Sequence, residues 1–168
     1  MLKRVLIANR GEIALRVRRA CREAGIETVS VYSQADAEAL HVQLATRSMC
    51  IGPPRAADSY LNPQALLSAA IATGCDGLHP GYGFLSENPE FADACAENGI
   101  TFIGPSGDAI RKAGSKSAAR DLMRAAGVPV TPGSDGPVSS VEDALAVAET
   151  VGLSLIHISE PTRLGMIS

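Results

Sequence analysis

The sequence predicts an α/β fold: a Rossmann-like, doubly wound parallel sheet over roughly residues 1–105. Short apolar runs alternate with segments of helical spacing, which is the pattern of an open sheet covered by helices. The first strand, helix and strand fit within about thirty residues, the length of a unit with two parallel strands and a right-handed crossover. Aromatic residues make up only 4% of the chain and Trp is absent, so we expect an aliphatic core rich in Ala.

The first predicted strand is Val5–Ala8, a continuous apolar run typical of a strand buried on both faces. A turn at residues 9–11 follows, and residues 12–24 then carry apolar side chains at helical spacing. Gly25 is a suitable residue to end that helix. The second strand is expected at residues 28–32.

The same alternation continues along the chain. Asn62 caps and Pro63 opens one helix, and Asn88 with Pro89 opens another. The other expected strands are 49–51, 76–78 and 101–103, and the expected helices are 63–73, 89–99, 115–126 and 141–151. Residues 133–137 contain two glycines and a proline, which predicts a loop and a candidate hinge between domains.

The composition is that of an ordinary globular protein, with 46% hydrophobic and 20% charged residues and a formal net charge of −3. Basic residues are scattered apart from one N-terminal cluster, so no nucleic acid is expected as a partner. No apolar run is long enough to cross a bilayer, and no secretory signal precedes the first strand. We therefore expect a cytoplasmic protein with no membrane contact.

Four cysteines, Cys21, Cys50, Cys75 and Cys95, are widely spaced, without Cys-x-x-Cys or a His at ligand spacing. In a cytoplasmic chain this pattern predicts small buried hydrophobic residues rather than disulfides or a zinc site. No metal ligand is expected among them.

The segment His79–Asn88, with the sequence His-Pro-Gly-Tyr-Gly-Phe-Leu-Ser-Glu-Asn, is the most informative one in the chain. Gly81 and Gly83 let the backbone pass close to another group, and the following helix presents free N–H donors behind the loop. Ser86 stands where the third glycine of a dinucleotide-binding fingerprint would be, which argues against nicotinamide binding. Taken alone, the histidine is more typical of a structural residue than of a catalytic one.

Three other features each have two interpretations. The turn at residues 9–12 fits either a capped tight turn or a ligand contact at the end of a strand. Arg16, Arg19 and Glu23 share one helix face, which favours an exposed face with an internal ion pair, and a charged subunit contact is the alternative. Lys116, in the first turn of a helix, is either an ordinary surface lysine or a residue that holds an anion such as a phosphate.

Read together, two segments closely resemble the N-terminal domain of biotin carboxylases, which serve acetyl-CoA, propionyl-CoA, methylcrotonyl-CoA and pyruvate carboxylases. They are residues 5–14, Val-Leu-Ile-Ala-Asn-Arg-Gly-Glu-Ile-Ala, and the segment His79–Asn88. Shorter segments in the family's order and spacing are Tyr60-Leu61-Asn62, Phe102-Ile103-Gly104-Pro105, Gly114-Ser115-Lys116 and Ala126-Gly127-Val128-Pro129. The likeness extends from residue 1 to about residue 152.

The resemblance implies an ATP-grasp ligase that activates bicarbonate with ATP as carboxyphosphate and carboxylates a carrier-bound biotin. The implied site residues are Lys116 for ATP, Tyr82 and Gly83 in a loop facing biotin and the active site, and Arg16, Arg19 and Glu23 at a homodimer interface. The implied cofactors are ATP, Mg²⁺ or Mn²⁺, and biotin. The implied partners are a biotin carboxyl carrier and a carboxyltransferase.

The resemblance also sets the expected domains: residues 1–110 form the N-terminal, pre-ATP-grasp domain, and residues 111–152 form the helical beginning of an incomplete ATP-grasp domain. Residues 153–168 depart from the family, which continues there with a strand carrying a second ATP lysine and a glycine-rich loop. This tail resembles translated sequencing-adaptor DNA, so we expect a non-native sequencing artefact. The family's magnesium ligands and catalytic base come later, so no catalytic residue is expected here and the chain alone is expected to be inactive.

Two alternatives come from other functional classes. A catalytically inert short protein could act through the dimer surface, and a natural stop codon in an intact reading frame would support it. Another Rossmann-like nucleotide-binding enzyme is disfavoured because G-x-G-x-x-G is absent. Asp36 is the nearest acidic residue after the second strand that such an enzyme could use, and a failure to bind NAD would exclude it.

Overall fold

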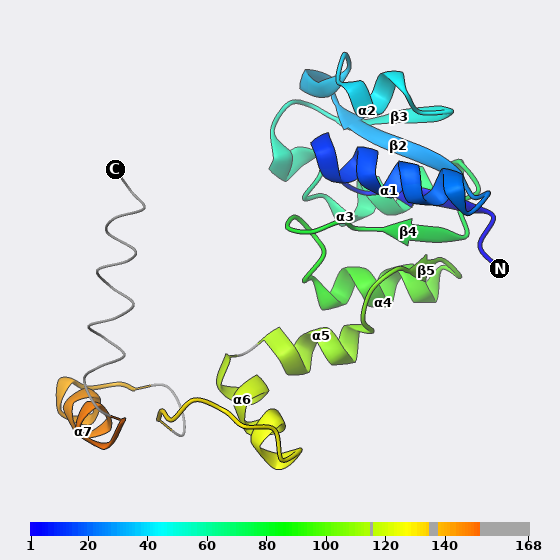
Figure 1. Cartoon of the computed structure of the whole chain (residues 1–168). Coiled ribbons are helices and arrows are strands. Elements are labelled where there is room, and N and C mark those ends of the chain that lie inside the picture. The colour runs from blue at the N-terminus through cyan, green and yellow to red at the C-terminus, as the bar shows by residue number, and fades with distance from the viewer. Residues whose placement is uncertain (115, 135–137, 152–168) are drawn as a thin grey trace. The chain divides into compact units, whose positions relative to one another are not determined.

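A computed structural model describes residues 1–114, 116–134 and 138–151. The chain divides into two compact units, Met1–Gly114 and Ser115–Ser168. The first unit holds the sheet and the segments that the sequence singled out around residues 9 and 79 (Figure 1).

The first unit is built on a sheet of five parallel strands, which confirms the predicted α/β class. The strands are β1 (Arg4–Ile7), β2 (Glu27–Ser33), β3 (Arg47–Gly52), β4 (Gly77–His79) and β5 (Thr101–Phe102). Their spatial order is β3-β2-β1-β4-β5, so the chain starts in the middle, builds one side and then crosses to the other. The switch lies between β1 and β4, which pair from Val5 with Gly77 to Ile7 with His79.

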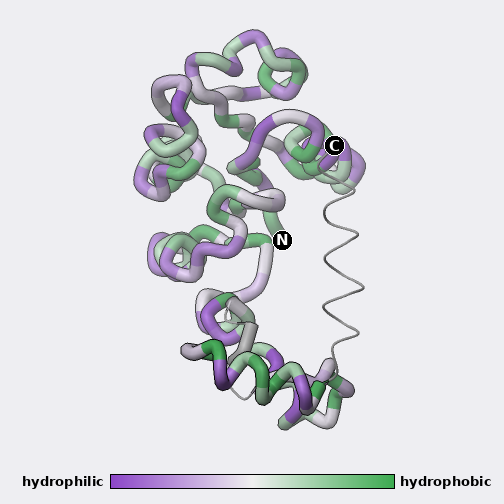
Figure 2. Tube along the Cα trace, turned by 90° about the vertical axis from the view of Figure 1, so that its left-hand side faces the viewer, coloured by the Kyte–Doolittle hydropathy of each residue, from purple (hydrophilic) through white to green (hydrophobic). Residues whose placement is uncertain are grey.

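Helices connect these strands and cover the sheet. They are α1 (Gly11–Glu23), α2 (Leu40–Gln43), α3 (Pro63–Ala72), α4 (Pro89–Glu97) and α5 (Gly107–Gly114), with short 3-10 turns at Gln34–Asp36 and Ala56–Asp58. Figure 2 shows hydrophilic and hydrophobic residues mixed along the helices, as expected for helices with one buried side.

Two apolar clusters lie on the two faces of the sheet, because successive side chains of a strand point to opposite sides. Val5 and Ile7 of β1 pack with α1 through Ala14 and Val17. Leu6 belongs to the larger cluster, which includes side chains of α3 and α4. All three β1 side chains are fully buried, as predicted for a central strand covered on both faces.

The caps predicted for two helices are present. The Asn62 side chain accepts a hydrogen bond from the backbone N–H of Ala65 at 3.1 Å, and Asn88 accepts one from Phe91 at 2.8 Å. Each cap precedes a proline in the first turn of its helix. The second cap fixes where the loop after β4 ends, because α4 begins directly behind it.

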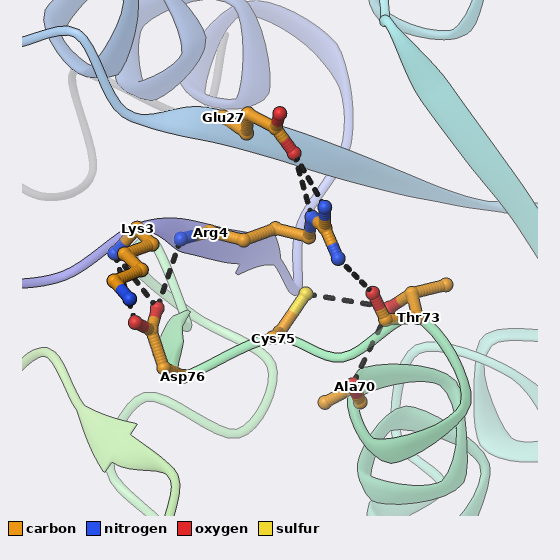
Figure 3. A network of polar contacts seen from close by, with 7 residues as sticks. All are labelled: Lys3, Arg4, Glu27, Ala70, Thr73, Cys75 and Asp76. Carbon is orange, nitrogen blue, oxygen red and sulfur yellow. Dashed lines mark hydrogen bonds and ion pairs between the residues drawn. The ribbon is translucent and has the colours of Figure 1, made fainter.

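Hydrogen bonds also tie β1 to β4 at the amino ends of the strands (Figure 3). The Asp76 carboxylate accepts from the backbone N–H groups of Lys3 and Arg4, at 2.9–3.1 Å. The Arg4 guanidinium donates to Glu27 at 2.8 Å and to the carbonyl of Thr73 at 2.8 Å. The backbone hydrogen bonds hold the pKa of Asp76 below its usual range.

The fold departs from the sequence expectations in two places. Helix α5 was not predicted, because only two of its eight residues, Gly107 and Ile110, are buried. Arg111 contacts α4 through an ion pair with Asp93 at 2.7 Å. Cys50 is exposed, so the prediction of four buried cysteines was wrong for this one. It lies on β3, an edge strand that pairs with only one other strand. An edge strand is more open to solvent than a central strand, which has a neighbour on each side.

The described part of the second unit contains α6 (Lys116–Ala125) and α7 (Val141–Val151), close to the two predicted helices. The candidate hinge at 133–137 lies partly outside the described residues, and the predicted tail at 153–168 lies wholly outside them. No helix among the described residues is long and apolar enough to span a membrane.

Candidate functional site

The candidate site lies where the carboxyl ends of β1 and β4 diverge. In open α/β sheets this switch point is where the connecting loops leave a crevice for ligands. Two loops meet there: residues 8–10 after β1, and residues 80–88 after β4. Both were singled out by the sequence, and the structure brings them into direct contact.

Asn9 makes that contact. Its side chain is 3% exposed, and its amide nitrogen donates to the carbonyl oxygens of Pro80 at 2.8 Å and Tyr82 at 2.9 Å. Its amide oxygen accepts from the backbone N–H of Arg10 at 2.9 Å. Every polar group of the side chain except one acceptor lone pair is therefore used. The sequence left this turn between a tight cap and a ligand contact, and the structure makes it the support of the second loop.

His79 ends β4 and holds the start of the loop. Its Nδ1 accepts a hydrogen bond from the backbone N–H of Gly81 at 3.0 Å, so Nδ1 carries no proton in this arrangement. Burial lowers the pKa of the imidazole, because the charged form is poorly solvated there. The structural interpretation of this histidine is the one that the geometry supports.

Three residues of the loop, two of them glycines, have a positive φ. Gly81 and Gly83 have φ of 69° and 66°, and Phe84 has φ of 44°, which is costly for a residue with a side chain. The Phe84 ring stacks on Tyr60 with a centroid distance of 5.2 Å, which compensates for the backbone strain. Leu85, next in the chain, is buried, so the loop is anchored on both sides of its tip.

Tyr82 stands at the exposed tip, with 60% of its surface accessible to solvent. Its hydroxyl donates a hydrogen bond to the carboxylate of Glu12 in the first turn of α1. This hydrogen bond, and to a smaller degree the charge of the carboxylate, raises the pKa of Tyr82, while the positive charge of Arg16 acts in the opposite direction. The tip is thus held from the side by α1 and from below by Asn9.

A second polar group, which the sequence did not predict, lies beside the loop. The Arg10 guanidinium sits over the rings of Tyr60 and Phe84, 5.5 and 5.8 Å from their centroids. One of its nitrogens lies 3.5 Å from Asp36, whose carboxylate also accepts hydrogen bonds from the hydroxyls of Tyr60 at 2.7 Å and Ser33 at 2.9 Å. Asp36, the nearest acidic residue after the second strand that a nucleotide-binding enzyme could use, is therefore already engaged.

This group has strongly biased protonation states. Burial alone would raise the pKa of Asp36, but the hydrogen bonds from Tyr60 and Ser33 and the charge of Arg10 bring it below its usual value. Burial and the neighbouring carboxylate raise the pKa of the Tyr60 hydroxyl well above 10. At neutral pH the pair is a phenol that donates to a carboxylate, which suits support of the loop and not proton transfer.

The predicted interface residues lie along α1. Arg16, Arg19 and Glu23 are all exposed. Within residues 1–114 no ion pair joins them to one another, so the internal ion pair expected from their spacing was wrong. Spacing of three and four residues permits such a pair without requiring it, because exposed charges gain little from pairing.

Lys116 is the first residue of α6, in the second unit. Its side chain lies outside the described part of the structure, so its predicted contact with ATP stays a prediction. Among the described residues, no group of three or more His, Cys, Asp or Glu side chains could hold a metal ion. What the described site offers is a rigid, exposed loop tip with a phenol, backbone groups and no nucleophile–base pair.

The family model of the biotin carboxylase N-terminal domain matches residues 1–110. Biotin carboxylase 1 of Bacillus subtilis is 56% identical over 156 residues, and the biotin carboxylase of Pseudomonas aeruginosa is 54% identical over 157 residues. Each alignment covers 93% of this chain and 35% of the relative. The chain thus spans only about a third of the length of the curated relatives it matches.

The solved structures that this chain resembles are also biotin carboxylases. The complex of biotin carboxylase with β-γ-ATP from Campylobacter jejuni is 48% identical with a TM-score of 0.86, and covers 90% of this chain and 34% of that one. The biotin carboxylase domain dimer of the Hydrogenobacter thermophilus 2-oxoglutarate carboxylase, in complex with MgADP, ADP and bicarbonate, is 47% identical with a TM-score of 0.84. It covers 90% of this chain and 33% of that one.

Proposed function

Since this chain belongs to the family of biotin carboxylase N-terminal domains, we propose that it is the N-terminal part of an ATP-dependent biotin carboxylase. The activity of such a ligase is the carboxylation of carrier-bound biotin with bicarbonate, through carboxyphosphate. The observation that carries the proposal is the switch-point loop. The family's most specific segment, His79–Asn88, is held rigidly at the edge where ligands bind in this fold class.

The proposed roles follow the fold. Tyr82 and Gly83, at the exposed tip, face biotin and the active site. Lys116 holds ATP, since a lysine at a helix start is favoured there only if it meets an anion. Arg16, Arg19 and Glu23 form part of a homodimer interface, for which exposed charges on one helix face are suited.

The reaction requires more than this chain contains. ATP supplies the phosphoryl group with Mg²⁺ or Mn²⁺, and phosphoryl transfer depends on positioning and on charge stabilisation. Among the described residues, no group of three or more His, Cys, Asp or Glu side chains fits this ion. We therefore propose that the chain is inactive alone. Its own part is to present the Tyr82 loop to biotin, which a carrier partner brings and a carboxyltransferase later uses, in the cytoplasm.

The test compares two purified chains. One is the 168-residue chain, and the other is residues 1–151 joined to the remaining two thirds of the Bacillus subtilis relative. Bicarbonate-dependent ATP cleavage with free biotin is measured for both. Activity in the extended chain alone supports the proposal. Activity in the short chain contradicts its predicted inactivity, and inactivity of a folded extended chain contradicts the assigned function.

A further inference from the structure

We propose that Asn9 is a positioning residue for biotin: it touches no substrate, but it holds the Tyr82–Gly83 tip in its binding geometry. This inference rests on the proposed function, because it needs the tip to face biotin. Its structural part stands on the contacts of Asn9 alone.

Asn9 holds two peptide groups of the loop, the one that precedes Gly81 and the one that follows Tyr82. Its amide nitrogen donates to the carbonyl of Pro80 and to that of Tyr82, and these two carbonyls are two residues apart in the loop. A donor with two protons in a fixed planar arrangement sets the orientation of both peptides at once. The direction in which Tyr82 leaves the loop is thereby set from beneath.

The other polar contacts of the tip are either exposed or local to the loop, such as the hydrogen bond from the Ser86 backbone N–H to the Gly83 carbonyl at 2.9 Å. Tyr82 and Gly83 are exposed, and the lateral support of Tyr82 is its hydrogen bond to Glu12, an exposed residue. Contacts between exposed polar groups contribute little because water competes for them. Asn9 is almost fully buried, so its hydrogen bonds are protected from this competition.

Asn9 also packs tightly against Gly81. A β-carbon on Gly81 would lie 2.6 Å from the Asn9 amide nitrogen, closer than β-carbons approach other atoms, and 3.0 Å from the Asn9 β-carbon, a very tight contact. The amide of Asn9 thus lies directly against the backbone of Gly81 and leaves no room for a side chain there. An amide that both donates hydrogen bonds and packs against the backbone fixes the tip more narrowly than hydrogen bonds alone.

The other end of the same strand pair offers a matched control. Asp76 joins β4 to β1 at their amino ends, through the backbone N–H groups of Lys3 and Arg4 (Figure 3). Its loss weakens the same two strands without touching the loop after β4. If Asn9 only stabilises the fold, substitutions of Asn9 and of Asp76 should have the same effect on loop hydrogen exchange and on biotin KM. If Asn9 positions the loop, only its own substitution should change them.

The experiment uses Asn9→Asp, which keeps the shape of the side chain but replaces the donor group by an oxygen that repels both carbonyls. Asn9→Ala is the second variant, and Asp76→Ala is the control. In the 168-residue chain, we expect faster amide hydrogen exchange at residues 81–86 in the Asn9 variants and not in Asp76→Ala. In the extended chain, we expect a rise in KM for free biotin of about ten- to a hundredfold. KM for ATP should change by less than about twofold, since misplacement is confined to the tip.

Two outcomes overturn the inference. One is unchanged exchange at residues 81–86 in folded Asn9 variants. The other is a biotin KM that changes no more in the Asn9 variants than in Asp76→Ala. A wild-type extended chain that binds no biotin contradicts the proposed function and, with it, the biotin part of the inference. The exchange measurement then still decides whether Asn9 orders the loop.

Discussion

Asn9 and Gly81 fit together as a pair: the side-chain nitrogen of Asn9 lies only 2.6 Å from the point where a β-carbon at position 81 would be. The glycine also has φ of 69°, in the left-handed region. Two separate requirements therefore exclude a side chain at position 81. One is local to the backbone, and the other is imposed by Asn9 in the loop after β1.

These two requirements can be separated by a double-mutant cycle. Gly81→Ala should destabilise the chain by about 1–3 kcal/mol through backbone strain, with a further cost from the overlap. Asn9→Ala should cost about 1–3 kcal/mol through its lost hydrogen bonds. In the double variant the overlap is relieved, so the combined loss should be smaller than the sum by about 0.5–3 kcal/mol. Urea unfolding measures all four chains, and additive losses would show that the overlap has no energetic effect.

The Tyr60–Asp36 hydrogen bond predicts that wild type is more stable than Tyr60→Phe, and that this difference becomes smaller at both low and high pH. Tyr60→Phe should lose about 1–3 kcal/mol at pH 7, because a donor to a carboxylate is removed. The lowered pKa of Asp36 stabilises the fold above its unfolded value of about 3.9, and this contribution is lost as pH falls through the folded pKa. The raised pKa of Tyr60 stabilises the folded state below about pH 10, and this contribution is lost as pH rises through the folded pKa.

The difference between wild type and Tyr60→Phe should therefore be largest between about pH 5 and 9 and should narrow on both sides. Urea unfolding across this pH series checks it. Tyr32→Phe is the control, because within residues 1–114 its hydroxyl makes no hydrogen bond. A difference that is the same at every pH would mean that the phenol acts through packing alone.

His79 predicts a separate loss of stability in mild acid. Burial lowers its pKa from 6.5, so the folded state resists protonation more than the unfolded state does. Its contribution is complete above pH 6.5 and is lost as pH falls through the folded pKa. His79→Asn keeps an acceptor for the Gly81 N–H but cannot take up a proton in this range. Between pH 7.5 and about 5.5, the variant should lose less stability than wild type. Urea unfolding measures both proteins. Equal losses of stability in the two proteins would exclude His79 as the cause.

The proposed ATP contact predicts an effect confined to one substrate. In the extended chain, Lys116→Met should raise KM for ATP by about ten- to a hundredfold, the loss expected for a charged contact to phosphate, and leave KM for biotin nearly unchanged. Lys112→Met is the matched control, since Lys112 is an exposed helical lysine paired with Asp108 at 2.8 Å. Equal effects of the two substitutions on KM for ATP would contradict a specific role of Lys116.

Sequence reasoning succeeded where the determining interactions are local. Val5–Ala8 reads as a buried strand from its composition, and the caps at Asn62 and Asn88 follow from a capping residue before a proline. Helix α5 could not be recognised in this way. Only Gly107 and Ile110 of its eight residues are buried, so the segment is too short and too polar to show a clear apolar face in the sequence. The ion pair of Arg111 with Asp93 of α4 is a tertiary contact that no local pattern indicates.

The site was predicted as two separate segments, and their joint action was not. The contact between Asn9 and Pro80 spans 71 positions of sequence, and it exists because β1 pairs with β4 in one register. No spacing rule gives that register, since the order of strands in the sheet was not known. The exposure of Cys50 escaped prediction for the same reason, because it depends on β3 being an edge strand.

The central place of β1 also has a consequence for synthesis on the ribosome. β2 follows soon after β1, but the other edge of β1 must wait for β4, whose first residue is Gly77. At about 5–20 residues per second, the roughly 70 residues between them take several seconds to make. During that interval the nascent chain presents one unpaired edge of an apolar strand, a template for wrong pairing. A chaperone at the ribosome would have those seconds in which to cover it.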